Sequence, residues 1–466
     1  MFVMAKNEDN IYVKALDEFI ERERKYVDYG FCIGGIPAYG VVRRHLRGQY
    51  CEKKGVGATN LPIRNNKQSV SNILKSFCQI VKLLFGFKKY KYFVYSFYRT
   101  DKIGEVYFDK FTDPLIDNSL IKESYIIFEH NNCGEHKIPR VHSEKVVYTD
   151  FIDALAVFKT KVNRLLFKNK YLKEYDRLWS MLDLLMGDVN YNKETIKVLI
   201  TRFAFRNKIY KRILGKLGIK KLVAPARPVF LDLIYAAKKI GVTVYEVQHG
   251  VLSNTAISYS GEVDEPFTPD YFLSYGKLKH PELYAISSDK IVNIGWALPF
   301  YMKTIDCLPN SSHENDILVV LNPLTSRSVI EIVLNLAQKF HGVVFCLRPH
   351  PTEAIPKELQ KQIDQTNNVI IQNSSVNCTY ALSMYNNVIG DNSTMMNEAF
   401  AEGKKVGRLS YPGFSPLYLN EEEEEKTWKI YDDLSFKAYL DAEPFHEIKT
   451  SVYSAYNREL VDRLFD

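Results

Sequence analysis

The chain has 466 residues, of which 46% are hydrophobic and 25% are charged, and its formal net charge is +7. This length exceeds what one compact core holds, so we expect two folded domains. No stretch approaches the about 18 consecutive apolar residues of a membrane-spanning helix, and the opening "MFVMAKNEDN" lacks the regions of a secretory signal, so neither is expected.

The cysteines indicate the compartment. The seven cysteines are scattered and form no C-x-x-C pair. This pattern predicts a reducing compartment, with neither a zinc site nor a disulfide framework. The net charge is modest for the length; it could suit an anionic ligand, an anionic lipid surface or no particular partner, and it decides little by itself. We therefore expect a cytoplasmic protein.

A strongly basic segment comes early in the chain. Residues 53–100 contain lysines and arginines but no Asp or Glu. Within them, Ser71 to Lys91 predicts an amphipathic helix with apolar residues at helical spacing, namely Ile73, Phe77, Ile80 and Leu84. Such a helix either lies on an anionic membrane surface or packs on the core with its lysines in solvent. The membrane-surface alternative predicts peripheral contact of Ser71 to Lys91 with the inner face of a membrane.

The following elements predict an α/β domain. Strands are expected at 91–99 and 124–132, and one long or broken helix over 150–185. From residue 220 the pattern alternates, with a strand at 220–225, a helix at 229–241, and strands at 242–248, 269–276 and 290–296. Strands and helices joined by short loops predict parallel pairing with right-handed crossovers.

A polar, turn-rich segment at 303–316 is the best candidate linker. Beyond it the alternation restarts, with strands at 317–323, 342–348, 368–372, 386–391 and 405–410 and with helices at 328–340 and 394–403. We predict two Rossmann-like domains that face a cleft, an amino-terminal acceptor-side domain over 1–305 and a donor-binding domain over 306–466. Ligands are expected at the carboxyl ends of the strands.

The first candidate site residues are Gln248, His249 and Gly250, which end a strand. A histidine there can point into the crevice, titrates near neutral pH and can act as a general base. The glycine would allow a sharp turn or the close approach of a ligand. A purely structural role for the histidine is the alternative.

The second candidate is "LRPHP", in which two prolines stiffen the loop that carries Arg348 and His350. Together these side chains can hold a phosphate or diphosphate by charge-assisted hydrogen bonds. The alternative is a rigid loop whose arginine pairs with a nearby carboxylate.

The third candidate is "IGDNSTMMNEA", where Ser393 and Thr394 begin a helix. The exposed N–H groups and positive dipole end of that helix suit a phosphate. Glu398 lies about one turn further, and its carboxylate could accept both hydroxyls of a ribose. Ordinary helix capping with a solvated glutamate is the alternative.

Other motifs are missing from the sequence. It contains no D-x-D, no H-E-x-x-H and no Walker-type phosphate loop, so neither a metal ion nor another cofactor is expected. Nothing is similar to a helix-turn-helix or RNA-recognition signature, so nucleic acid is not an expected partner.

At this point a family resemblance enters. The order "VQHG", "LRPHP" and "GDNSTMMNEA" followed by "GKKVGRL" resembles bacterial surface and capsular polysaccharide glycosyltransferases of the GT-B type. It is also similar to the CDP-glycerol glycerophosphotransferases of teichoic acid synthesis. The likeness covers about residues 222–410.

The resemblance implies a role for each motif. His249 is the implied catalytic base, Arg348 and His350 would contact the donor diphosphate, Ser393 and Thr394 would bind phosphate, and Glu398 would hold the ribose. Gln248 and Gly250 would form the acceptor-side loop. The implied activity is metal-independent transfer of a sugar from a nucleotide donor to a cell-surface glycan or lipid-linked acceptor. A nucleotide-sugar epimerase, a polyol-phosphate transferase and a non-catalytic glycan-assembly scaffold are the alternatives on the same fold.

Overall fold

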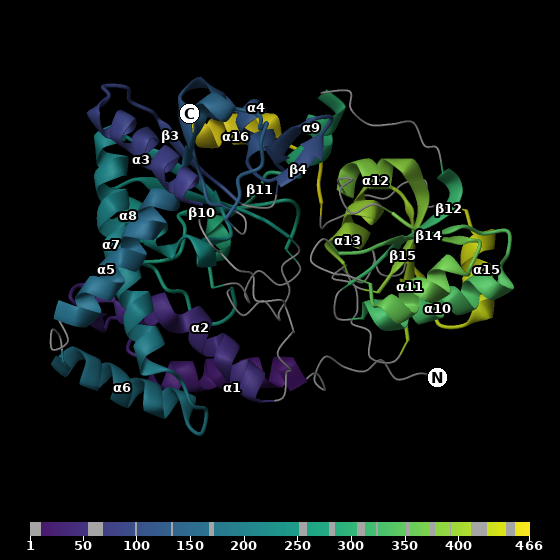
Figure 1. Cartoon of the computed structure of the whole chain (residues 1–466), viewed down its shortest axis with the longest axis horizontal. Coiled ribbons are helices and arrows are strands. Elements are labelled where there is room, and N and C mark those ends of the chain that lie inside the picture. Colours follow the sequence, from purple (N-terminus) through teal and green to yellow (C-terminus); the bar gives the residue numbers. More distant parts are fainter. Residues whose placement is uncertain are drawn as a thin grey trace.

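The computed structural model describes residues 11–54, 69–97, 100–131, 134–166, 172–250, 259–278, 285–304, 313–322, 325–350, 355–372, 378–391, 393–411, 426–443 and 453–466. They form two α/β domains that stand side by side, the first on the left of Figure 1 and the second on the right. The predicted α/β class with two Rossmann-like domains is thus confirmed, since each domain is built on one parallel sheet.

The first sheet has seven strands, and all of them are parallel. Their order across the sheet is β7 (Val146–Tyr148), β6 (Tyr125–Glu129), β3 (Tyr92–Ser96), β8 (Lys221–Pro225), β9 (Thr243–Val247), β10 (Tyr271–Ser274) and β11 (Ile291–Asn293). The chain first moves outward from β3 to β7 and then restarts at β8 on the other side of β3. The topological switch point therefore lies between β3 and β8.

Helices cover this sheet and extend beyond it. Those of the first domain are α1 (Ile11–Tyr26), α2 (Ala38–Lys53), α3 (Val70–Phe85), α4 (Asp113–Asp117), α5 (Asp150–Leu166), α6 (Leu172–Met186), α7 (Lys193–Leu217), α8 (Leu231–Lys238) and α9 (Ala297–Thr304). The helix expected over 150–185 is broken into α5 and α6. Two short hairpins complete the domain, β1 (Cys32–Ile33) with β2 (Ile36–Pro37) and β4 (Thr100–Ile103) with β5 (Val106–Asp109).

The long helix α7 joins the two parts of this domain. The Asn192 side chain caps its start by accepting from the N–H of Thr195, and it ends at Gly218, whose φ of +70° is readily adopted by glycine. Its carboxyl half packs in the core of the sheet, while its amino half packs with α1, α2 and α6 in a separate helical core below the sheet (Figure 1).

The second sheet has six parallel strands. Their order is β14 (Val369–Ile371), β13 (Phe345–Arg348), β12 (His313–Val320), β15 (Tyr385–Gly390), β16 (Lys405–Leu409) and β17 (Trp428–Ile430). The switch point lies between β12 and β15. The helices of this domain are α10 (Ser326–Lys339), α11 (Lys357–Asp364), α12 (Cys378–Met384), α13 (Thr394–Ala401) and α15 (Asp433–Asp441).

The end of the chain returns to the first domain. Helix α16 (Arg458–Phe465) packs its Val461 and Phe465 into the core of the first sheet. The Tyr245 hydroxyl donates to the Leu464 carbonyl at 3.0 Å. Residues 453–466 therefore belong spatially to the first domain, whereas the boundary between residues 305 and 306 stays a prediction, since residues 305–312 lie outside the described part of the chain. No helix among the described residues is long and apolar enough to cross a bilayer.

Candidate functional site

The two domains meet at a small pocket of about 50 Å³. Its residues come from both domains, and most follow the carboxyl ends of strands or begin a helix: Lys110, Phe111, His249, Gly250, Tyr275, Trp296, Leu298, Thr394, Glu398 and Tyr453. Four of the residues predicted from the sequence, His249, Gly250, Thr394 and Glu398, thus line one pocket. A volume of this size accommodates only one or two water molecules in the arrangement described.

The loop after β9 holds His249. The buried Gln248 side chain braces the loop, because its Nε2 donates to the Gly250 carbonyl and its Oε1 accepts from the Tyr275 N–H, both at 2.8 Å. Apart from its chain neighbours, no atom of the described residues lies within 4 Å of the position that a Cβ on Gly250 would take. Gln248 therefore shapes the loop and Gly250 leaves room at the pocket.

Aromatic rings surround His249. The centroid of its ring lies 5.9 Å from that of Phe97 and 6.4 Å from that of Phe111, and both pairs are arranged edge to face. Its Nδ1 lies 3.4 Å from the Tyr259 hydroxyl, which in turn lies 2.6 Å from Oε1 of the buried Glu246. Arg227 faces the same carboxylate, with its N–H 2.8 Å from Oε1 and its Nε 3.3 Å from Oε2. The Tyr259 hydroxyl and the two phenylalanine rings therefore fix the orientation of the His249 ring.

The opposite wall comes from the switch point of the second sheet. Helix α13 begins directly after β15, and Ser393 caps it by accepting from the Met395 N–H at 3.3 Å. The Thr325 hydroxyl, which follows β12, donates to Asp391 Oδ2 at 2.6 Å and so ties the ends of the two central strands together. Ser393 serves as a helix cap, while Thr394, the next residue, lies in the pocket.

Glu398 is the acidic group of the pocket and is 5% exposed. Burial raises the pKa of Glu398, against the lowering effect of the positive charges on Lys110 and Arg348. Lys110 comes from the first domain and lines the same pocket. A buried carboxylate that shares a pocket with a lysine can accept hydrogen bonds from a polyol.

The second predicted loop sits apart from the pocket lining. Arg348 is buried at the end of β13 and donates to Gln372 Oε1 at 2.7 Å. His350 is exposed. The loop continues into residues 351–354, which lie outside the described part of the chain. The structure therefore places the Arg348 guanidinium close enough to act on Glu398 electrostatically, but neither side chain lines the pocket.

Sequence reasoning missed several pocket residues. Tyr275 and Trp296 follow β10 and β11, so their position just past a strand was the available signal. The Tyr275 hydroxyl is buried and has no hydrogen-bond partner among the residues that the structure describes. Tyr453 stacks on Tyr275 with ring centroids 5.9 Å apart, although almost two hundred residues separate them. An orphaned hydroxyl at a pocket wall is suited to a ligand oxygen.

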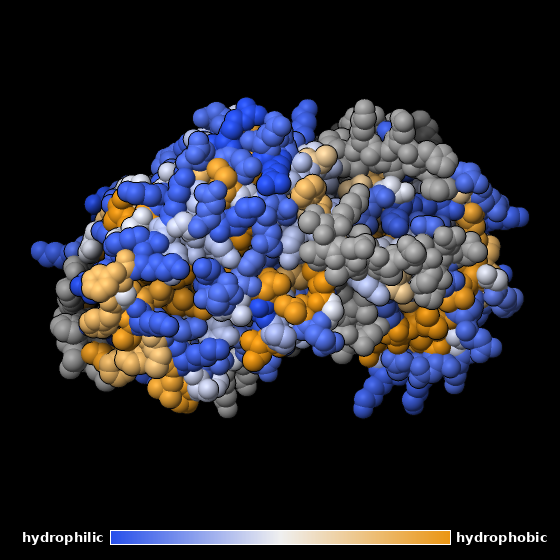
Figure 2. Space-filling view, turned by 90° about the horizontal axis from the view of Figure 1, so that it is seen from above, coloured by the Kyte–Doolittle hydropathy of each residue, from blue (hydrophilic) through white to orange (hydrophobic). Residues whose placement is uncertain are grey.

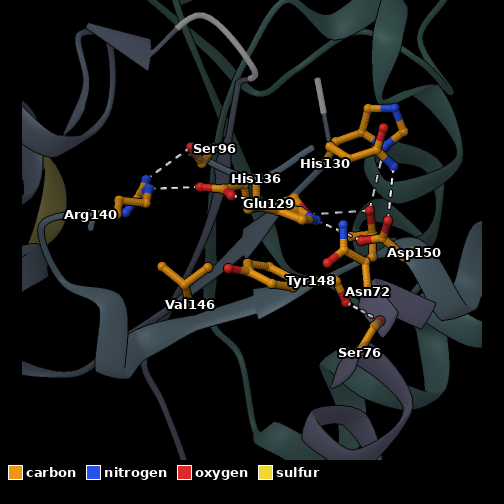
Figure 3. Close-up of polar contacts among 12 residues, drawn as sticks. Asn72, Ser76, Ser96, Glu129, His130, His136, Arg140, Val146, Tyr148 and Asp150 are labelled. Atoms are coloured by element: carbon orange, nitrogen blue, oxygen red, sulfur yellow. Dashed lines mark hydrogen bonds and ion pairs between the residues drawn. The ribbon is translucent and has the colours of Figure 1, made fainter. Parts of the chain in front are cut away.

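A second polar cluster lies at the carboxyl ends of β3, β6 and β7 (Figure 3). At the carboxyl ends of β6 and β7, His136 bridges Glu129 and Asp150, with both nitrogen–oxygen distances at 2.7 Å. Arg140 pairs with Glu129 at 2.6 Å and donates to the Ser96 hydroxyl at 3.0 Å. All of these groups are buried.

The cluster reaches the pocket through Asp109. This carboxylate accepts from the Ser96 hydroxyl at 2.7 Å and from the backbone N–H groups of Phe97, at 2.6 Å, and Phe111, at 2.9 Å. The rings of these two phenylalanines are the ones that contact His249. The buried cluster thus fixes the backbone that carries the aromatic wall.

Neither a family model nor a curated protein sequence matches this chain. Among solved structures, it is similar to UDP-GlcNAc 2-epimerase of Methanocaldococcus jannaschii in complex with UDP-GlcNAc and UDP, at 12% identity and a TM-score of 0.44, over 80% of this chain and 97% of that one. For the UDP-GlcNAc 2-epimerase of Neisseria meningitidis bound to UDP-GlcNAc, the identity is 11% and the TM-score 0.43, over 80% of this chain and 97% of that one. For the wall teichoic acid polymerase TagF, the identity is 12% and the TM-score 0.40, over 85% of this chain and 90% of that one. These similarities are distant.

Proposed function

We propose that this chain is a metal-independent GT-B glycosyltransferase that moves a sugar from a nucleotide-activated donor to a cell-surface glycan or lipid-linked acceptor. The observation that carries the proposal is the shared pocket, where His249 from one parallel sheet faces Thr394 and Glu398 from the switch point of the other. The GT-B assignment and the cytoplasmic location, at the inner face of a membrane, are part of the same proposal.

In this mechanism His249 accepts the proton of an acceptor hydroxyl. The acceptor oxygen then forms a bond to the anomeric carbon, and the bond from that carbon to the nucleotide diphosphate breaks, with the electron pair leaving on the phosphate oxygen. The start of α13, with Ser393 and Thr394, binds phosphate, and Glu398 accepts the ribose hydroxyls. Arg348 and His350 approach the donor diphosphate from the neighbouring loop.

The pocket has to open before such a donor enters. A volume of about 50 Å³ is far smaller than the roughly 300 Å³ at which ligand sites begin. Because the lining comes from both domains, their separation enlarges it, and closure on the donor would exclude water and limit hydrolysis.

The decisive experiment combines binding and turnover. Purified protein is screened with nucleotides and nucleotide sugars for a rise in melting temperature, and the stabilising donor is then incubated with candidate acceptors in the presence of EDTA. We expect one nucleotide class to stabilise and transfer to proceed without metal. His249→Ala should lose about 10²-fold or more in turnover while donor stabilisation persists. His341→Ala, at an exposed site in the second domain, is the matched control.

The rival functions give different products. An epimerase would interconvert donor sugars without any acceptor, and a polyol-phosphate transferase would release CMP from a CDP-activated polyol. A scaffold would retain its cellular role in the His249→Ala variant. Absence of both transfer and nucleotide-dependent stabilisation would refute the transferase.

A further inference from the structure

Helix α3 has two apolar faces, and only one is covered. On the covered side Ile80 is buried in the core of the sheet, and the Ser76 hydroxyl donates to the Tyr148 carbonyl of β7. The opposite side leaves large apolar residues in solvent, with exposed fractions of 71% for Val70, 59% for Leu74 and 80% for Phe85. The sequence alternatives were a core-facing or a membrane-facing helix. The contacts of Ser76 and Ile80 fit the core-facing alternative on the covered side, and contact of the exposed side with a membrane stays a prediction.

Helix α5 extends the same surface. The Phe77 ring, itself 42% exposed, lies edge to face on Phe151 with centroids 5.0 Å apart. Phe158, about two helical turns after Phe151 on α5, is 64% exposed. Phe87, just past the end of α3, is 93% exposed. We refer to this set as the α3–α5 surface: Val70, Leu74, Phe77, Phe85, Phe87, Phe151 and Phe158. Apolar side chains gather on the amino-terminal domain in the space-filling view (Figure 2).

The exposed charges on α3, on the loop after it and on the described part of α5 are all positive. Lys75, Lys82, Lys88 and Lys89 are exposed on α3 and the loop after it, and residues 53–100 contain no acidic residue. Among the described residues of α5, the acidic ones, Asp150 and Asp153, are buried. Apolar side chains flanked by lysines, with no exposed acidic residue on α3 or on the described part of α5, complement a bilayer surface that carries negative headgroups.

We propose that the α3–α5 surface docks on an anionic lipid bilayer, with its phenylalanine and aliphatic side chains in the headgroup boundary and its lysines on lipid phosphates. A protein partner would more often require mixed charges around an apolar centre. This docking does not depend on the transferase activity, because it concerns a different face of the molecule.

The test is flotation of the full chain with phosphatidylcholine vesicles, alone or mixed with phosphatidylglycerol. We expect recovery with vesicles only when phosphatidylglycerol is present, and a fall as salt rises. The double variant Phe85→Ser with Phe87→Ser should bind at least about tenfold more weakly, and so should Lys88→Glu with Lys89→Glu. Leu434→Ser, which removes a side chain 79% exposed on α15, should bind as the native chain does.

Several outcomes would overturn this proposal. They are equal recovery with both vesicle types, no loss in either double variant, or loss in the Leu434→Ser control. Circular dichroism of each variant checks that it folds. If the native chain ignores vesicles but elutes as a dimer that the Phe85 and Phe87 changes dissociate, the α3–α5 surface is an interface between copies instead.

A different observation carries a second inference, which rests on the proposed role of His249. Glu246 Oε1 accepts from the Arg227 N–H and from the Tyr259 hydroxyl, and its Oε2 lies 3.3 Å from Arg227 Nε. Burial raises the pKa of Glu246, while the Arg227 charge and the two hydrogen bonds favour its carboxylate form, to which the Tyr259 hydroxyl donates. The Tyr259 oxygen can then only accept from His249 Nδ1. We infer that Glu246 and Tyr259 are positioning residues that keep the proton on Nδ1, so that Nε2 is the basic nitrogen.

The tautomer can be read without any activity. Long-range ¹H–¹⁵N spectra of histidine-labelled protein should show His249 protonated on Nδ1, with its signals identified by their loss in His249→Gln. Tyr259→Phe should shift this signal toward the other tautomer and lower turnover about tenfold at unchanged donor KM. The Nε2-protonated form in the native chain, or no shift in Tyr259→Phe, would overturn the inference. The Nδ1 form in a chain that transfers nothing would instead count against the proposed function alone.

Discussion

Replacing Tyr275 by phenylalanine should change stability and ligand binding in opposite directions. The ring is anchored independently of its hydroxyl, because it stacks on Tyr453 and its backbone N–H donates to Gln248 at 2.8 Å. The hydroxyl itself is buried without a partner among the described residues. Tyr275→Phe therefore removes only the oxygen and keeps the packing.

The expected changes in unfolding free energy and in donor affinity both follow from the hydrogen bonding of the Tyr275 hydroxyl. An unsatisfied buried hydroxyl costs about 1 to 3 kcal/mol, so the free energy of unfolding should rise by up to that amount. A hydrogen bond from the hydroxyl to a charged phosphate oxygen is worth about 1.5 to 3 kcal/mol, so the variant should bind the donor about 10- to 150-fold more weakly.

Urea unfolding without ligand and titration calorimetry with the stabilising nucleotide measure the two effects. Tyr271→Phe is a matched control, since Tyr271 lies at the start of the strand that precedes Tyr275 and outside the pocket lining. A variant that is both less stable and unchanged in binding would refute the reasoning. Such a result would mean that the hydroxyl stabilises the fold and does not meet the ligand.

Three further predictions concern the buried supports of the site. Glu129→Gln should lower the free energy of unfolding in urea by about 3 to 5 kcal/mol, because the buried Arg140 guanidinium and His136 imidazole lose the carboxylate that they share. The control Glu135→Gln, at a surface ion pair, should change this free energy by under about 0.5 kcal/mol. An equally small effect of Glu129→Gln would show that the cluster is solvated. Burial lowers the pKa of His136, but its hydrogen bonds to two carboxylates outweigh this and raise it. The protonated His136 thus contributes its full stabilisation of the fold below about pH 6.5, and this stabilisation is lost as the pH rises through the raised pKa. The loss of unfolding free energy caused by His136→Gln should therefore shrink between pH 6 and 9. A loss that grows over this range would contradict the prediction. Phe465→Ala, which empties a fully buried site, should cost about 3 to 5 kcal/mol in the same assay, whereas a cost near zero would mean that the last helix is not docked.

The sequence was informative wherever the chain repeats one simple pattern. Buried strands followed by helices predicted both parallel sheets, because short right-handed crossovers leave few other arrangements. The same logic predicted that His249, after a strand, and Glu398, in the helix after another strand, would lie near one crevice, and both line the pocket. It could not find Tyr453, because a residue that enters the pocket from the far end of the chain carries no local signal.

The faces of α3 show a second limit. Ile80 and Phe77 are three residues apart and equally apolar, yet one is buried and the other is 42% exposed. Periodicity identifies an apolar stripe but not which neighbours will cover it, because that depends on where β7 and α5 end up. Arg348 illustrates the same point for polar groups, since its partner Gln372 lies on a different strand end.

The return of the carboxyl-terminal helix to the first domain restricts how the molecule can move. The chain leaves this domain after α9 and is back in its core at Tyr453 and Phe465, so two covalent connections join the domains. Two covalent connections allow the domains a smaller range of separations and orientations than one connection would. Cutting either connection should therefore widen the range of positions that the domains take relative to each other, and with it the opening of the pocket, while both sheets stay intact.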